Sequence, residues 1–211
     1  MNTIALAFAV SLPAAFASAQ DAKLVAITGP VSIIAEGSGR FFKARGGEDL
    51  IYGDAIRVGK GGIAHVELGD RGAVLLREES LLTLKGSRRR TELAVAFGEF
   101  LVGLRRKLER GHTFKVRTPA ALAGVRGTLF WGKASKEDQS TTYAGFGHEI
   151  AVTAGGKTVV VAPGATVTVP FGSAPSDPSP SAFGLEYAKN FEIDGSLREL
   201  GALAETDKLQ K

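Results

Sequence analysis

Three histidines are the first residues whose chemistry could define a site. His65, His112 and His148 lie in separate segments of the 211-residue chain. A zinc site usually needs three or four ligands at a recognisable spacing, such as two histidines four residues apart. Glu149 follows His148, but no second histidine stands at that spacing, and the chain has no cysteine. We therefore expect strand-edge or solvent-facing histidines, no metal site, no disulfide and no thiol chemistry.

Neighbouring carboxylates could serve acid–base catalysis, as the two acids of a glycosidase do. Such a pair faces each other across a cleft at about 5–10 Å. Glu78 and Glu79 are adjacent, and adjacent residues on a strand point to opposite faces. Asp54 and Asp70 each follow a glycine, a turn-like position where an aspartate commonly bonds its own backbone. The sequence therefore predicts turn or solvent roles for these acids, as for Asp49, and no catalytic residue.

The glycine patterns that hold phosphate or expose a nucleophile are missing. The chain contains neither G-x-S-x-G nor G-x-x-x-x-G-K-[ST]. The glycine-rich stretch at 59–62 leads into another apolar segment rather than a helix whose N-terminus could bind phosphate. We interpret it as a hairpin and expect no bound cofactor.

Basic residues are concentrated in the middle of the chain. Residues 85–126 carry eleven basic residues and three acids, a local charge of +8 against +4 for the whole chain. Two clusters flank predicted strands at 91–97 and 99–104, and a hairpin about Gly98 would bring both clusters to its open end. The cluster residues are Arg88, Arg89, Arg90, Arg105, Arg106 and Lys107.

This basic patch has two interpretations. It could attract an anion, namely lipid phosphate, peptidoglycan carboxylate or an acidic protein, or it could be a solvated face. Nucleic acid is disfavoured, because no aromatic residues are interleaved with the clusters and because export is expected.

Short alternating runs define the elements that position these residues. Leu93, Val95 and Phe97 alternate with less apolar neighbours, and similar runs cut by glycine recur from residue 23 to residue 170. Strands every 8–12 residues with glycine punctuation indicate an all-β sandwich, barrel or solenoid.

A short motif interrupts the strands after residue 117. Pro119 ends an alternating strand at 112–117, because proline cannot donate to the ladder. Residues 120–123 could form one helical turn that Gly124 ends with a positive φ. Arg126 follows, and we interpret its guanidinium as structural, bonding turn carbonyls. An apolar strand then resumes at 128–131.

This strand, Thr-Pro, turn, Val-Arg-Gly-Thr, strand pattern resembles the hallmark of FecR-type domains. Residues 47–59 and 64–72 are similar to two further stretches of that family, although Arg71 is inserted between the acid and the glycine of the second. The resemblance covers roughly residues 23–170. It implies an elongated, twisted β-solenoid-like stack, whereas periodicity alone leaves a closed sandwich open. The motif residues to which it gives a structural role are Thr118, Pro119, Gly124, Arg126, Gly127 and Thr128.

The sequence divides into four parts. Residues 1–19 carry no side-chain charge and end in Ala-Ser-Ala, which predicts a signal peptide. Residues 20–172 form the FecR-type β-domain, and the proline- and serine-rich residues 173–181 are predicted as a linker. Residues 182–211 contain leucines at helical spacing and a capping-box pattern, which predict a short amphipathic helix near 196–209. That helix either docks back on the β-domain or meets a partner.

The FecR family is best known from the periplasmic half of bacterial cell-surface signalling regulators. Its membrane regulators add a cytosolic segment that binds a sigma factor and a transmembrane helix, neither of which is expected here. We therefore expect a stand-alone, non-enzymatic binding or scaffolding module, periplasmic or secreted, with an envelope protein or anionic envelope surface as partner. A soluble component of a signalling relay is the alternative, and an enzyme acting on envelope polysaccharide is the alternative from another class.

Overall fold

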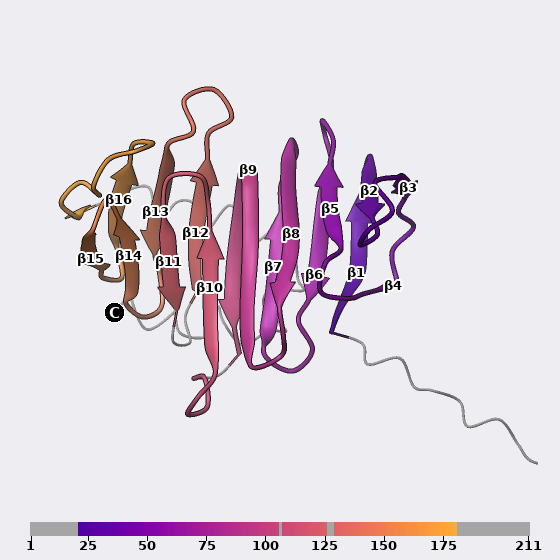
Figure 1. Ribbon diagram of the computed structural model, residues 1–211, viewed down its shortest axis with the longest axis horizontal. Helices are drawn as coiled ribbons and strands as arrows, with labels where there is room; N and C mark the ends of the chain where they lie inside the picture. The colour runs from indigo at the N-terminus through magenta and orange to yellow at the C-terminus, as the bar shows by residue number, and fades with distance from the viewer. Residues whose placement is uncertain (1–20, 106, 126–128, 181–211) are drawn as a thin grey trace, which may run out of the picture.

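The protein is built from β-strands throughout the residues that its computed structural model describes, 21–105, 107–125 and 129–180. The expectation of an all-β, elongated domain is confirmed (Figure 1). The strands in chain order are β1 (Ala22–Thr28), β2 (Val31–Ile34), β3 (Phe41–Lys43), β4 (Glu48–Leu50), β5 (Ala55–Val58), β6 (Ile63–Glu67), β7 (Gly72–Leu76), β8 (Ser80–Gly86), β9 (Arg90–Leu104), β10 (Thr113–Arg117), β11 (Leu122–Val125), β12 (Leu129–Ala134), β13 (Thr141–Gly145), β14 (Ile150–Ala154), β15 (Lys157–Val161), β16 (Ala165–Val169) and β17 (Ser179–Pro180).

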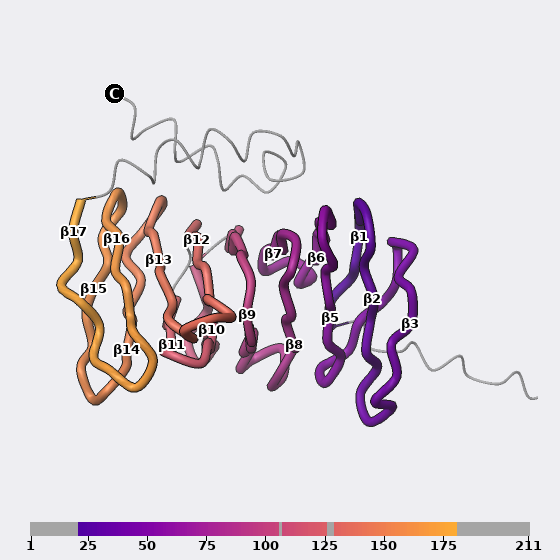
Figure 2. The backbone as a smooth tube through the Cα atoms, turned by 90° about the horizontal axis from the view of Figure 1, so that it is seen from above, coloured from indigo at the N-terminus to yellow at the C-terminus, as the bar shows by residue number. Residues whose placement is uncertain are grey.

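The strands form two layers that lie face to face, and the strands run across the long axis of the molecule (Figures 1 and 2). The layer that we call sheet A has the order β4–β1–β6–β7–β9–β12–β13–β16–β17. Sheet B has the order β3–β2–β5–β8–β9–β10–β11–β14–β15. The chain therefore moves along the long axis while it alternates between the layers.

Strand β9 belongs to both sheets. Its first half pairs with β8 in sheet B, and its second half pairs with β7 and β12 in sheet A. The change of sheet occurs at Gly98, whose φ is +105°, a value that favours glycine. At this corner the hydroxyl of Ser80 accepts a hydrogen bond from the backbone N–H of Glu99 at 3.1 Å. Because the strand doubles back at Gly98, both of its termini lie at the same edge of the molecule, where Arg71 contacts Arg88 and Arg105.

The pairing of β9 with β10 is parallel, whereas the other strand pairs of the described residues are antiparallel. A parallel neighbour needs a crossover, and residues 105–112 supply it by leading from sheet A into sheet B. Arg117 also links this pair on the outer face of sheet B, because its guanidinium donates to Glu92 at 2.9 and 3.1 Å. This hydrogen-bonded guanidinium holds the pKa of Glu92 below its usual range.

The core lies between the two sheets and follows the alternation of the sequence. In β10, Phe114 and Val116 are buried while the residues between and beside them are exposed, as their alternation predicts. Aromatic residues fill the centre: the ring of Phe100 makes edge-to-face contacts with Phe130 and Tyr143, at centroid distances of 6.3 and 6.4 Å. Where the alternation holds, as in β10, burial of every second side chain between the sheets stabilises the fold.

The predicted helical turn at 120–123 is wrong. Residues 122–125 form strand β11, which pairs with both β10 and β14, and Gly124 has no positive φ. The turn that precedes β11 is closed instead by Thr118, whose backbone N–H donates to the carbonyl of Ala121 at 2.9 Å. Two flanking ladders therefore override a local helix preference that four residues cannot sustain alone.

The predicted linker has a described part, residues 173–180, and this part lies along the domain. The backbone N–H of Ser176 donates to the carbonyl of Thr168 at 3.0 Å, and Lys157 forms an ion pair with Asp177 at 2.9 Å. Residues 179–180 add β17 to the edge of sheet A. The predicted signal peptide and C-terminal helix lie outside the described residues. Within the described part of the chain, no helix is long and apolar enough to cross a membrane.

Candidate binding surface at the basic end

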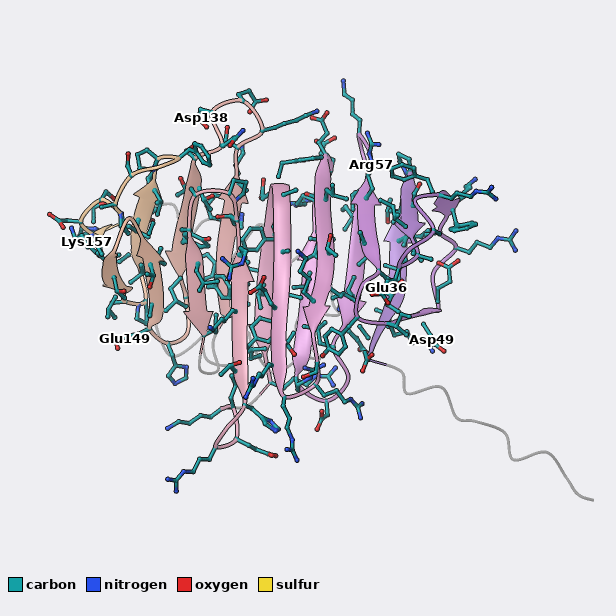
Figure 3. All side chains as sticks on the ribbon, viewed as in Figure 1. Glu36, Asp49, Arg57, Asp138, Glu149 and Lys157 are labelled. Carbon is teal, nitrogen blue, oxygen red and sulfur yellow. The ribbon has the colours of Figure 1, made fainter. Side chains whose placement is uncertain are left out.

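Both basic clusters lie at one edge of the sandwich, below the lower ends of β8, β9 and β10 in Figure 1; we call this edge the basic end and define it as residues 87–90, 105 and 107–112. The first segment is the turn between β8 and β9, and the second is the crossover into β10. The second segment meets the first where β10 begins, because the backbone N–H of Thr113 donates to the carbonyl of Arg89 at 2.8 Å. Their described residues include six basic residues and one acid, Glu109, a net charge of +5. Figure 3 shows nitrogen-bearing side chains projecting below the lower ends of β8, β9 and β10.

The predicted hairpin about Gly98 is wrong in its pairing, because the two halves of β9 bond to different sheets rather than to each other. The fold still brings the clusters together, since β9 doubles back. The predicted partner-binding residues that the structure describes are exposed at this end: Arg88, Arg89, Arg90, Arg105 and Lys107. Arg105 forms an ion pair with Glu67 at 3.3 Å. Arg106 lies outside the described residues.

Arg71 ties the basic end together from the turn between β6 and β7. Its Nε donates to the carbonyl of Leu68 at 3.1 Å in its own turn. Its Nη1 reaches sheet B, where it donates to the carbonyl of Arg88 at 3.1 Å and to the hydroxyl of Thr91. The backbone carbonyl of Arg71 also accepts from the N–H of Arg105 at 2.8 Å. One residue therefore joins sheet A to both basic segments.

A hollow of about 150 Å³ lies between the two basic segments. Its lining residues are Asp70, Arg71, Arg88, Lys107, Leu108, Glu109 and His112. The Nδ1 atom of His112 is 3.9 Å from Glu109, a contact that becomes an ion pair only when the imidazole is protonated. Guanidinium and ammonium groups beside a small concave space are suited to binding an oxyanion.

Replacing Arg71 tests whether it holds the basic end. We expect Arg71→Ala to lower the free energy of unfolding by about 1–3 kcal/mol, because the replacement leaves several acceptors without their donor. Arg71→Lys should restore only part of this loss, since an ammonium lacks the planar fork of donors. Urea melts of both variants measure the effect, with exposed Arg89→Ala as the control. Equal midpoints for Arg71→Ala and Arg89→Ala would contradict the role.

The family model described as FecR protein matches residues 54–165, more than half of the chain. The chain belongs to the FecR family. No curated protein matches it.

The FecR-family fold also occurs in two solved structures of a candidate anti-sigma factor from Parabacteroides distasonis. One is 20% identical with a TM-score of 0.54, and the match covers 64% of this chain and 62% of that chain. The other is 19% identical with a TM-score of 0.55, and covers 64% of each. The chain thus spans less than two thirds of these neighbours, and the likeness shows the shared fold.

The FecR motif is built around a buried hydroxyl. The Thr118 side chain accepts hydrogen bonds from the backbone N–H of Ala121 at 3.2 Å and from the hydroxyl of Thr141 at 2.8 Å. It also contacts the hydroxyl of Tyr143 at 3.2 Å. Burial raises the pKa of Tyr143, which therefore stays protonated. Pro119 is exposed beside this network, and Arg126, Gly127 and Thr128 lie outside the described residues.

The other residues considered for chemistry are dispersed. His65 is buried on β6, His112 lines the hollow and His148 is exposed in the turn before β14. No group of three or more potential metal ligands occurs among the residues that the structure describes. Asp54 has the predicted turn role, because its carboxylate accepts from the N–H of Ile51 at 3.0 Å. Glu78 bonds the N–H of Gly61 at 2.6 Å.

Sequence reasoning missed the role of Arg71. One signal was present, because Arg71 is an insertion in a turn that is one residue shorter in the family pattern. Its hydrogen-bond acceptors could not be predicted, because they lie in segments that only the fold brings near this turn. The sequence did find the two basic segments, because charge is visible without a structure.

Proposed function

We propose that this FecR-family protein is a non-enzymatic binding module of the bacterial cell envelope, and that its basic end contacts an anionic partner. The observation that carries the proposal is the basic end itself. Two loops whose described residues carry a net charge of +5 meet at one edge of the molecule, and Arg71 contacts both of them. Clustered charges of one sign raise the local concentration of an oppositely charged partner.

A location in the periplasm or outside the cell is part of the proposal. The uncharged, apolar N-terminal stretch with its Ala-Ser-Ala sequence supports export. The absence of cysteine is compatible with an oxidising compartment in which the two-layer core, rather than disulfides, provides stability. In that compartment the anionic surfaces include lipid phosphate and peptidoglycan carboxylate.

A component of a cell-surface signalling relay is the second candidate. The observation that favours it is the match to the FecR family, together with the fold shared with a candidate anti-sigma factor. In this case the basic end would meet an acidic protein surface. The two candidates differ in the partner, and a binding experiment separates them.

Charge reversal at the basic end tests the proposal. The three exposed residues Arg89, Lys107 and Arg110 are changed to glutamate, and binding to phosphatidylglycerol-containing vesicles is measured by flotation. Each basic residue near an acidic membrane contributes about 1 kcal/mol, so we expect binding to weaken at least about tenfold at low salt. Wild-type binding should also fade as salt rises, because the Debye length shortens.

The matched control reverses three exposed basic residues away from this end, Arg40, Lys43 and Lys60. Each triple variant lowers the net charge by six, from +4 to −2. Loss of binding only in the first variant supports an anionic partner at the basic end. Equal loss in both would mean that net charge alone decides, and no binding to vesicles with retained capture of an acidic envelope protein would favour the relay.

A further inference from the structure

The outer face of sheet A carries an apolar stripe. Sheet registers place His65, Leu75, Leu101, Trp131, Ala144 and Thr166 directly opposite one another across six strands. Leu129 and Phe146 extend the stripe toward the basic end, and these apolar residues form a cluster separate from the core between the sheets. A stripe six strands wide is about 24 Å long at the usual strand spacing.

The side chains of this stripe are shielded from water, although the outer face of a two-layer molecule should be exposed to solvent. Leu75, Leu101 and Trp131 are 3%, 1% and 3% exposed. On the outer face of sheet B, by contrast, Val160 is 52% exposed. The described residues provide no third layer over sheet A (Figure 2).

A buried polar atom at the end of the stripe also indicates that a further group covers this face. The hydroxyl oxygen of Thr166 is buried, and within the described residues it has no hydrogen-bond partner. Buried hydroxyls are normally bonded, and a polar group docked on this face would supply the missing partner. Thr166 stands opposite Ser179, beside the point where the described chain ends at Pro180.

We propose that the chain's own C-terminal segment, residues 182–211, covers this stripe with the apolar face of its predicted helix. The leucines at 197, 200 and 203 share one face at helical spacing. A helix over 196–209 is about 21 Å long, which matches the stripe. The 15 residues at 181–195 can extend up to about 50 Å, which exceeds the roughly 24 Å from β17 to β7.

A second copy of the chain is a weaker candidate for the cover, because the low exposure is that of a single chain. The helix would also gain stability from docking, since a segment of this length is marginal alone in water. The inference is independent of the basic end, which lies on the strand connections rather than on this face.

Trp131 is the test's probe, because it is the only tryptophan in the chain and lies in the stripe. In the full chain, Leu197, Leu200 and Leu203 are changed together to serine. We expect the emission of Trp131 to move to longer wavelength and its quenching by iodide to rise severalfold. The control changes three residues on the opposite helix face, Arg198, Ala202 and Glu205, to serine and should leave both signals at the wild-type value.

Unchanged emission in the leucine variant, with its β-sheet circular dichroism retained, overturns the proposal. Wild-type emission that depends on protein concentration also overturns it and assigns the cover to a second copy. If the leucine variant fails to fold, cross-linking decides, because the chain has no natural cysteine. Ala144→Cys should form a disulfide with Leu200→Cys but not with Ala202→Cys, and equal cross-linking, or none, contradicts docking of this face.

Discussion

Gly98→Val is expected to lower the free energy of unfolding by about 3–5 kcal/mol. Two costs add: a positive φ strains a branched residue by about 1–3 kcal/mol, and overpacking a filled site costs a similar amount. The φ of Gly98 is +105°, and a Cβ there would stand 2.5 Å from the Cβ of Ser80 and nearer still to its Cα and Oγ. Ser80 is fully buried, so it cannot move aside. Denaturant melts measure the loss.

Gly111→Val is the matched control for the strain at Gly98. Gly111 also has a positive φ, +85°, but a Cβ there would meet no atom within 4 Å. Its variant should therefore show the cost of strain alone, about 1–3 kcal/mol. If both variants unfold at the same denaturant concentration, the corner of β9 is not tightly packed, and our account of how the strand changes sheets is wrong.

Thr118→Val is expected to cost about 2–4 kcal/mol. Valine keeps the shape of threonine but removes the oxygen that serves Ala121, Thr141 and Tyr143, and each buried group left without a partner costs about 1–3 kcal/mol. The loss should appear in a thermal or urea melt as a lower midpoint with an unchanged slope.

Two controls accompany Thr118→Val. Tyr143→Phe removes a single hydroxyl from the same network and should cost less. Thr142→Val breaks an exposed threonine pair, 3.1 Å from Thr168, and should leave the midpoint almost unchanged. A wild-type midpoint for Thr118→Val would show that the motif is maintained for something other than stability.

The alternation of apolar and polar residues was sufficient to predict the strands of this protein from its sequence. The segment predicted at 112–117 is β10, and the segments predicted at 91–97 and 99–104 are the two halves of β9. Glycine punctuation indicated where strands end. The resemblance to FecR-type domains, which three short motifs suggested, is confirmed by the family match.

The pairing of the strands into two sheets could not be predicted in the same way. Gly98 signals a break in alternation, and a break is equally consistent with a hairpin and with a corner between sheets. The shielded outer face of sheet A was missed because β7 is apolar at every position, so alternation does not say which of its faces meets the core. The contacts of Arg71 depend on turns distant in sequence and could not be inferred.

The double membership of β9 has a consequence for how the protein unfolds. Linear arrays of strand pairs usually lose cooperativity with length, because each unit contacts only its neighbours. Here one strand carries ladder bonds to β7 and β12 in one layer and to β8 and β10 in the other. Neither layer can open at its centre without opening the other. A molecule with the outline of an extended array should therefore melt as a single unit, with its most protected amides in β9.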